Sequence, residues 1–302
     1  MMIKILYKIA LVAILLSLSA CIREGFDKSC PASLYLKYDW SQSRPLTDKD
    51  SLSMIGENGE VINVATDIFG TPLDLPDGHY YVTAYEPVDE ITVDGITISA
   101  DLLPDGTLAD LPLFNAGMNS FQISSNMPDT LLLPMWKQTR ELIVKIHFIG
   151  AGIANLEKVK GLVDGITLSR HIDEGFQPLD GKPHHSAITS GAANLEFLPF
   201  EENTLSLFAA STSVTPNMEN FMTDKRLLGI DGAVEQKLTL YLTFDTGKVL
   251  TQKFDISRDI YNFHIDQVDE PFVIEITLRL GADMTADIVD WQSGPSFDMD
   301  AN

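Results

Sequence analysis

Apolar and polar residues alternate along most of the chain, in short segments that turn residues separate. Residues 33–40 place four apolar or aromatic side chains on one face, which is typical of a half-buried strand. Residues 79–85 repeat this alternation directly after a Leu-Pro-Asp-Gly turn at 75–78. Residues 91–98 predict two short strands around an Asp-Gly turn, and residues 130–133 predict the strand that closes this first unit.

A second set of alternating segments begins at residue 141. Residues 141–148 alternate over their whole length, whereas residues 153–160 carry apolar residues at helical spacing, which predicts one or two helical turns. Further strands are predicted at 163–169, 194–199, 204–211, 236–244, 248–255 and 271–280, with a hairpin turn at 244–248. Many short strands with few helices predict an all-β fold made of β-sandwiches.

The strand pattern pauses between residues 134 and 140, which indicates a domain boundary there. We therefore expect two tandem β-sandwich domains, one over residues 33–136 and one over residues 137–302 that includes a C-terminal segment. Apolar residues make up 45% of the chain, which is ample for two cores and argues against disorder.

The first 20 residues follow a different pattern. Lys4 and Lys8 precede an apolar run that begins at Ile9 and ends in small residues before Cys21. This order is that of a secretory signal peptide, so residues 1–20 are expected to be removed. A transmembrane helix is the alternative, but residues 9–20 are too few to span about 30 Å of hydrocarbon at about 1.5 Å per residue.

Leu18-Ser19-Ala20-Cys21 also resembles the bacterial lipobox. The resemblance implies that Cys21 is acylated and becomes the mature N-terminus, with residues 21–32 as a lipidated tether. Each buried CH₂ of an acyl chain contributes about 0.8 kcal/mol to membrane binding. We therefore expect a lipoprotein anchored to the outer membrane through the acyl chains on Cys21. Cys30 is then left without an intramolecular partner, and we interpret it as a buried inert thiol, with pairing to another chain as the alternative.

The chain is strongly acidic, with 43 acidic and 21 basic residues and a net charge of −22. Such a surface repels nucleic acid, which is therefore excluded as a direct partner. The region from Glu57 to Asp129 holds 13 acidic residues and no Lys or Arg. We interpret it as a solvated surface. Calcium binding is the alternative, but the spacing of a calcium-binding loop does not occur in it.

Motifs of catalysis are absent from the sequence. It contains no Gly-x-Ser-x-Gly, no phosphate-binding glycine-rich loop and no His-Glu-x-x-His. The adjacent His184 and His185 lie in a loop-like segment, and His147 and His264 lie among apolar residues, which is typical of core histidines. We therefore expect neither an enzyme nor a bound cofactor or metal. The aromatic residues are interpreted as core, with stacking on sugars as the alternative: Tyr80, Tyr81, Tyr85, Trp136 and Trp291.

Several of these features together resemble one family, the fimbrillin-associated lipoproteins that anchor or accessorise type V fimbriae. The features are the lipobox followed by Cys30-Pro31, the strand at 34–38, the segment 75–82, the segments 142–148 and 161–169, and Val289-Asp290-Trp291. The resemblance covers most of the mature chain and implies two transthyretin-like β-sandwiches. The sequence departs from the family pattern at 51–59, where a hydrophobic strand with an Asp-Gly turn is usual.

The resemblance implies a lipid-anchored anchor or accessory subunit that joins fimbrial shaft or accessory subunits at the cell surface. The expected mechanism is β-strand addition, in which a strand of one subunit pairs with an open sheet edge of the next. We expect residues 286–299 to engage the neighbour, with Ile288, Trp291 and Phe297 as apolar anchors. The same segment is equally compatible with a final edge strand of the second sandwich.

Two other functions remain open at this point. One is a glycan-binding surface lipoprotein, and the other is a scaffold that faces the periplasm. A planar row of exposed Trp or Tyr side chains would favour glycan binding. Buried aromatic side chains together with an open sheet edge would favour assembly.

Overall fold

The protein is almost entirely β-structure, as its sequence predicts. The structure is a computed structural model. It describes residues 32–41, 43–46, 49–56, 61–67, 71–123, 130–172, 188–200, 218–260, 263 and 270–295. Four features that the sequence predicts therefore lie outside the described residues: the signal peptide with Cys21, Cys30, the strand at 204–211, and Phe297. The same holds for His184, His185 and His264.

The first half of the chain forms two facing sheets. One has the order β4-β1-β9, and the other has the order β10-β8-β5-β2-β3. The strands are β1 Ala32–Asp39, β2 Lys49–Gly56, β3 Val61–Asp67, β4 Thr71–Leu75, β5 Gly78–Tyr85, β8 Asn115–Ile123, β9 Thr130–Pro134 and β10 Trp136–Lys137. Alternate residues of these strands meet in one core that includes Leu36, Met54, Val82, Phe121 and Leu133. The alternation in the sequence thus marks the faces that are buried.

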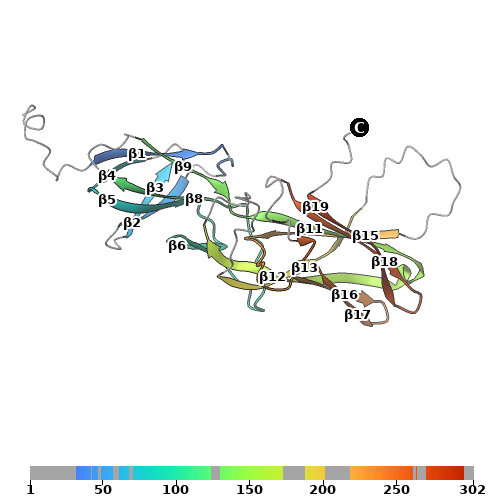
Figure 1. Ribbon diagram of the computed structural model, residues 1–302. Helices are drawn as coiled ribbons and strands as arrows, with labels where there is room; N and C mark the ends of the chain where they lie inside the picture. Colours follow the sequence, from blue (N-terminus) through green and yellow to red (C-terminus); the bar gives the residue numbers. More distant parts are fainter. Residues whose placement is uncertain are drawn as a thin grey trace, which may run out of the picture.

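The second half forms a larger sandwich. One sheet has the order β14-β15-β11-β18-β19, and the other has the order β17-β16-β12-β7-β6, with β13 paired to β12. The strands are β6 Ile91–Asp94, β7 Thr97–Ala100, β11 Arg140–Ile149, β12 Leu156–His171, β13 Thr189–Glu196, β14 Leu198–Pro199, β15 Met218–Leu227, β16 Lys237–Phe244, β17 Val249–Asp255, β18 Phe272–Leu280 and β19 Ala286–Pro295. In Figure 1 the two halves follow one another along the long axis of the molecule.

The hairpin of β6 and β7 connects the two halves. It precedes residue 136 in the chain, yet β7 pairs with residues 169–171 of β12 in the second sandwich. Ile91 and Ile98 of this hairpin lie in the same core as β11 and β18. The domain boundary between residues 136 and 137 stays a prediction. The pairing shows that β6 and β7 belong to a sheet of the second sandwich although they precede this boundary in the chain.

The segment after β11 differs from its prediction. Helical turns are predicted over 153–160, but the structure has a 3₁₀-helix at Ala151–Asn155 and strand β12 from Leu156 onward. Residues 156–163 pair with β16, and this ladder outweighs the local helical spacing. Gly150 has a φ of 110°, a conformation that favours glycine, and it begins the 3₁₀ turn.

Two buried arginines lie where the chain enters the second sandwich. Arg140 at the start of β11 donates from Nε to the carbonyl of Glu270 at 3.1 Å and from Nη1 to the carbonyl of Phe263. Its guanidinium also lies over the rings of Phe263 and Phe272, at 5.5 and 5.7 Å from their centroids. Arg170 of β12 is equally buried and donates to three carbonyls. Backbone dipoles thus surround both charges.

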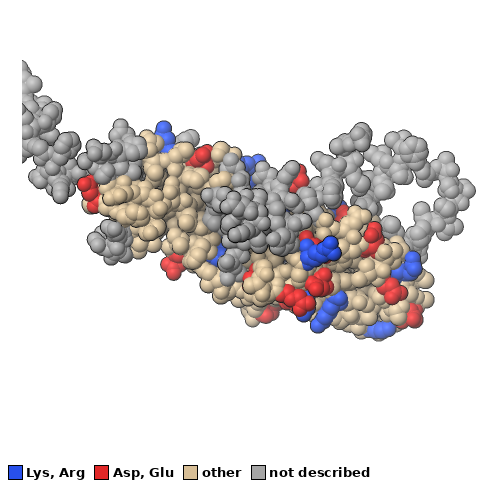
Figure 2. Space-filling model, viewed as in Figure 1, with Lys and Arg blue, Asp and Glu red and all other residues tan. Residues whose placement is uncertain are grey.

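The described surface carries charges of both signs. Figure 2 shows Asp and Glu side chains interspersed with Lys and Arg over the visible face of the second half. In the part of the chain that the structure describes, no helix is long and apolar enough to cross a membrane. Within the same residues, no three His, Cys, Asp or Glu side chains gather closely enough to hold a metal ion.

Candidate functional site: two open edges of the second sandwich

The strand β19 is one edge of the second sandwich. It pairs antiparallel with β18 from Ala286 to Pro295, and none of the described strands pairs with its other side. Residues 286–295 thus form the final edge strand that the sequence allowed as an alternative. An edge strand presents a row of unpaired N–H and C=O groups, which is a template for pairing with another chain.

A β-bulge interrupts this edge strand. Thr277 of β18 pairs with Asp290, but Leu278 pairs with Ile288, so Val289 is the extra residue. Ile288 is 57% exposed and Val289 is 45% exposed, although they are adjacent aliphatic residues. In a regular strand of a sandwich one of two neighbours would be buried. The bulge therefore creates a small exposed apolar surface at the sheet edge.

Trp291, the second predicted anchor, occupies a different position. Its ring packs against Phe254 of β17 in the opposite sheet, with 5.7 Å between the ring centroids. It is partly buried and belongs to the border of the second core. At the start of β19, Gln252 of β17 donates to the carbonyl of Ala286 at 3.3 Å. Trp291 thus closes one side of the sandwich, and of the three predicted anchors the structure places Ile288 alone on the described surface.

At the opposite end of the same sheet, β15 is left largely uncovered by the short edge strand β14. On one side β15 pairs with β11 from Met218 to Leu227, but on the other side β14 covers only Phe221 and Met222. Phe200 N donates to the carbonyl of Asn220 at 3.0 Å, so the backbone groups of Asn220 point toward β14. These groups alternate in direction along an antiparallel strand. Those of Asp224 and Arg226 therefore point to the same side, where none of the described strands follows.

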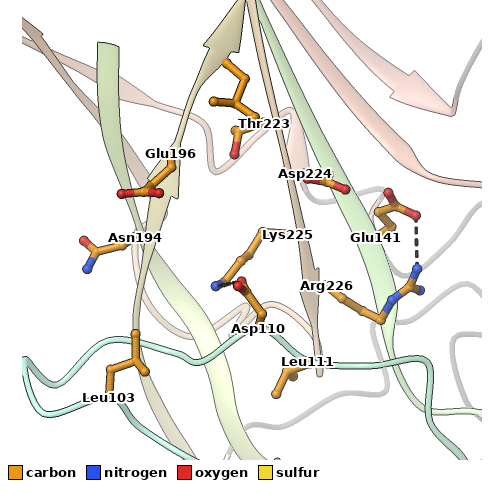
Figure 3. A pocket seen from close by; sticks show the side chains of 11 residues that line it. Leu103, Asp110, Leu111, Glu141, Asn194, Glu196, Thr223, Asp224, Lys225 and Arg226 are labelled. Carbon is orange, nitrogen blue, oxygen red and sulfur yellow. Dashed lines mark hydrogen bonds and ion pairs between the residues drawn. The ribbon is translucent and has the colours of Figure 1, made fainter. Parts of the chain in front are cut away.

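A groove of about 660 Å³ lies beside this uncovered edge (Figure 3). Its walls come from β13, β15, the first residues of β11 and the loop between β7 and β8. The lining residues are Leu103, Asp110, Leu111, Glu141, Asn194, Glu196, Leu198, Thr223, Asp224, Lys225 and Arg226. The groove thus occupies the side of the sandwich opposite Trp291.

Two ion pairs cross the lining of this groove. Lys225 is 7% exposed and pairs with Asp110, whose side chain is 94% exposed. Arg226 pairs with Glu141 on the neighbouring strand at 3.1 Å. Glu196 and Asp224 have no cationic partner among the described residues. The groove therefore combines uncovered backbone groups with two uncompensated carboxylates.

A tight turn fixes the loop wall of the groove. Asp105 accepts hydrogen bonds from the hydroxyl and the backbone N–H of Thr107 and from the amide of Asn194. The bonds from Thr107 are the main cause of the lowered pKa of Asp105. Because the pKa is lowered, the stability that the ionised Asp105 contributes to the folded state is present above its ordinary pKa near 3.8. This stability is lost as the pH falls through the lower pKa of the folded state. The wall is therefore fixed at neutral pH.

The sequence pattern does not predict this groove. Its floor strand β15 was not predicted, because Thr223 and Lys225 occupy inward positions where apolar residues would mark a strand. The uncovered edge also depends on the shortness of β14, which no local pattern reveals. The alternation of buried residues at 221, 223, 225 and 227 is visible only in the structure.

Exposed aromatic side chains form no row on the described surface. The two exposed ones that are large, Tyr81 and Tyr241, lie on β5 and β16 in different halves. Tyr38 and Tyr80 are buried, and Trp40, Trp136 and Trp291 are partly buried. Of the two patterns that separate glycan binding from assembly, the structure has buried aromatics together with open sheet edges.

Solved structures share this fold. The fimbrial anchor protein Mfa2 from Porphyromonas gingivalis has a TM-score of 0.58 at 11% identity, over 87% of this chain and 97% of that one. A candidate adhesin from Bacteroides ovatus has a TM-score of 0.56 at 12% identity, over 78% of this chain and 86% of that one. A candidate polysaccharide-binding protein (DUF1812) from Bacteroides thetaiotaomicron has a TM-score of 0.51 at 12% identity, over 89% and 99%.

No family model matches the chain, and no curated protein matches it in sequence. The likeness to these structures therefore concerns the arrangement of the strands. The three similar proteins are named for anchoring, adhesion and polysaccharide binding, and none of these names describes an enzyme.

Proposed function

We propose that the protein is a lipid-anchored subunit of a cell-surface fimbria, either its anchor or an accessory subunit. In this role the acyl chains on Cys21 hold the protein on the outer membrane, and an open sheet edge pairs with a strand of the neighbouring subunit. The proposal includes membership of the fimbrillin-associated lipoproteins, which the sequence resembles.

The observation that carries the proposal is the exposed edge strand β19. It has one side without a partner among the described strands and places two adjacent aliphatic residues, Ile288 and Val289, on the surface. Proteins usually protect edge strands with charges or prolines, because exposed edges associate with other chains. An apolar bulge on such an edge is therefore suited to a partner strand. The shared fold with a fimbrial anchor protein supports the same role.

Extraction of the full chain from the cell envelope in a mild detergent tests the proposal. We expect fimbrial subunits to copurify with it and to be identified by mass spectrometry. An eluate without fimbrial subunits but with components of polysaccharide uptake would contradict the proposal and favour the glycan-binding alternative.

The lipid anchor is tested separately. Replacing Cys21 with serine removes the thiol that would be acylated, so the protein should move from the membrane fraction to the soluble fraction after cell lysis. Immunoblots of the two fractions measure this distribution, and Cys30→Ser is the matched control that should leave the protein in the membrane. A Cys21→Ser variant that stays in the membrane fraction would exclude acylation as the anchor.

A further inference from the structure

We propose that the groove beside β15 binds an extended peptide of a partner protein as an added strand, and that it selects a peptide that carries Lys or Arg. The groove lies on the side of the second sandwich opposite β19, so it would provide a second contact. The inference depends on the proposed function only for the identity of the partner, which would be a fimbrial subunit.

The backbone of β15 supplies the first argument. Beyond Met222 the strand continues to Leu227 with β11 on one side only. The N–H and C=O groups of Asp224 and Arg226 face the open side, at the spacing that a β-ladder requires. Open space of about 660 Å³ lies against these groups, which gives room for side chains of an added strand. An extended peptide is the ligand class that uses alternate N–H and C=O groups in this way.

Charge supplies the second argument. Figure 3 shows Glu196 of β13 and Asp224 of β15 on opposite sides of strand β15, and both side chains line the groove. The nearby cations Lys225 and Arg226 are paired with Asp110 and Glu141. A Lys or Arg side chain of the peptide on the same face as Asp224 would therefore meet a carboxylate that lacks a cationic partner among the described residues. An acidic side chain there would be repelled by it.

The lining also contains apolar side chains between these charges. Leu103 is 41% exposed and Leu198 is 71% exposed, which is high for leucine in a folded domain. Leu111 lines the groove below them. Side chains of a strand alternate between its two faces, so a peptide that alternates Val with Lys would offer apolar side chains on one face and charges on the other. This composition fits the groove better than a uniformly polar one.

A smaller hollow continues the groove and reverses its charge. It has a volume of about 200 Å³ and shares Glu141 and Arg226 with the groove. Its other lining residues include the cations Arg44, Lys137 and Arg140, and one further acid, Glu270. The combined cleft is therefore acidic at Asp224 and basic toward Arg44. This polarity would orient a peptide with its basic residues over Asp224.

Fluorescence anisotropy with the detergent-solubilised full chain tests the proposal. One labelled probe is a short peptide of alternating Val and Lys, and the matched probe has Glu in place of Lys. We expect the Lys peptide to bind at least about tenfold more tightly than the Glu peptide, with the preference declining in high salt. Equal binding of the two peptides, or binding of neither, would overturn the proposal.

Two substitutions at one position separate the backbone from the charge. Asp224→Pro removes the N–H that faces the open side without removing a hydrogen bond to β11. It should therefore weaken binding of the Lys peptide at least about tenfold. Asp224→Asn keeps the backbone N–H but removes the carboxylate charge. It should weaken only the binding of the Lys peptide, by several-fold. Asp245→Asn makes the same chemical change in the exposed turn after β16 and should have no effect. Unchanged binding in both Asp224 variants would contradict strand addition at this edge.

Other occupants of the groove would give different results. A second copy of the chain would produce a dimer at high concentration that Asp224→Pro dissociates, and sedimentation velocity would detect it. This result would replace the proposed partner and overturn the proposal. The peptide measurements use purified protein, so their failure leaves the recovery of fimbrial subunits from the cell envelope as an independent result.

Discussion

Replacement of Arg170 by alanine is expected to lower the free energy of unfolding by about 3 to 4 kcal/mol, because buried hydrogen bonds to a charged group are lost together. Arg170 is 1% exposed. It donates to the carbonyls of Leu228, His171 and Gln138 at 2.8, 2.9 and 3.0 Å. Alanine would leave these three acceptors in a cavity without their donor. Urea denaturation followed by tryptophan fluorescence measures the change.

Two further variants define the cause of this loss. Arg170→Lys keeps the charge but lacks the planar guanidinium that reaches three acceptors, so its stability should lie between that of Arg170→Ala and that of the natural chain. Arg279→Ala removes an exposed arginine of β18 and should change the free energy of unfolding by no more than about 0.5 kcal/mol. A loss below about 1 kcal/mol in Arg170→Ala would contradict a stabilising role of these three hydrogen bonds.

Replacement of Gly117 by alanine is expected to have the second largest effect. Gly117 is buried in β8, and a Cβ there would overlap the carbonyl oxygen of Pro134 and approach Met135 Sδ to 3.2 Å. Pro134 ends β9, so the overlap would push apart the two sheets of the first sandwich. Overpacking against backbone costs about 2 to 3 kcal/mol. Differential scanning calorimetry should show a lower melting temperature.

Gly232 provides the matched control for this substitution. A Cβ at Gly232 would meet no atom within 4 Å, so Gly232→Ala should leave the melting temperature nearly unchanged. If Gly117→Ala also had no effect, the close approach of β8 to the end of β9 would not be a constraint on the first sandwich.

Strands that alternate strictly were predictable from the sequence. Residues 141–148 alternate in the sequence, and β11 buries every second residue over its ten residues. The same holds for β18, which buries Phe272, Ile274, Ile276 and Leu278. Both strands lie inside their sheet with one face toward the core, so burial alone determines their pattern. The all-β class was confirmed for this reason.

Features that depend on distant pairing were not predictable. The pairing of β7 with residues 169–171 of β12 joins segments about 70 positions apart, and no local signal specifies it. The bulge at Val289 is likewise set by the register between β18 and β19. Propensity describes single segments, whereas register depends on the partner strand.

The structure describes two of the three predicted partner-binding residues, Ile288 and Trp291. Ile288 lies on the surface as expected of an anchor, but Trp291 packs against Phe254 across the sandwich. An aromatic residue near a chain end looks the same in sequence whether it binds a partner or closes a core. The structure packs Trp291 against the core, and the partner roles of Ile288 and Trp291 stay predictions.

Recovery of fimbrial subunits with an Ile288→Asp variant is the sharpest test of the proposal that the edge at β19 joins a fimbrial neighbour. The change introduces a charge where the partner strand would contact an exposed aliphatic side chain. Val249→Asp is the matched control, because Val249 is 54% exposed on β17, at the edge of the other sheet. We expect Ile288→Asp to recover at least about tenfold less fimbrial subunit than the natural chain, a loss of about 1.4 kcal/mol, while Val249→Asp recovers the natural amount. Equal recovery with all three proteins would contradict assembly through this edge.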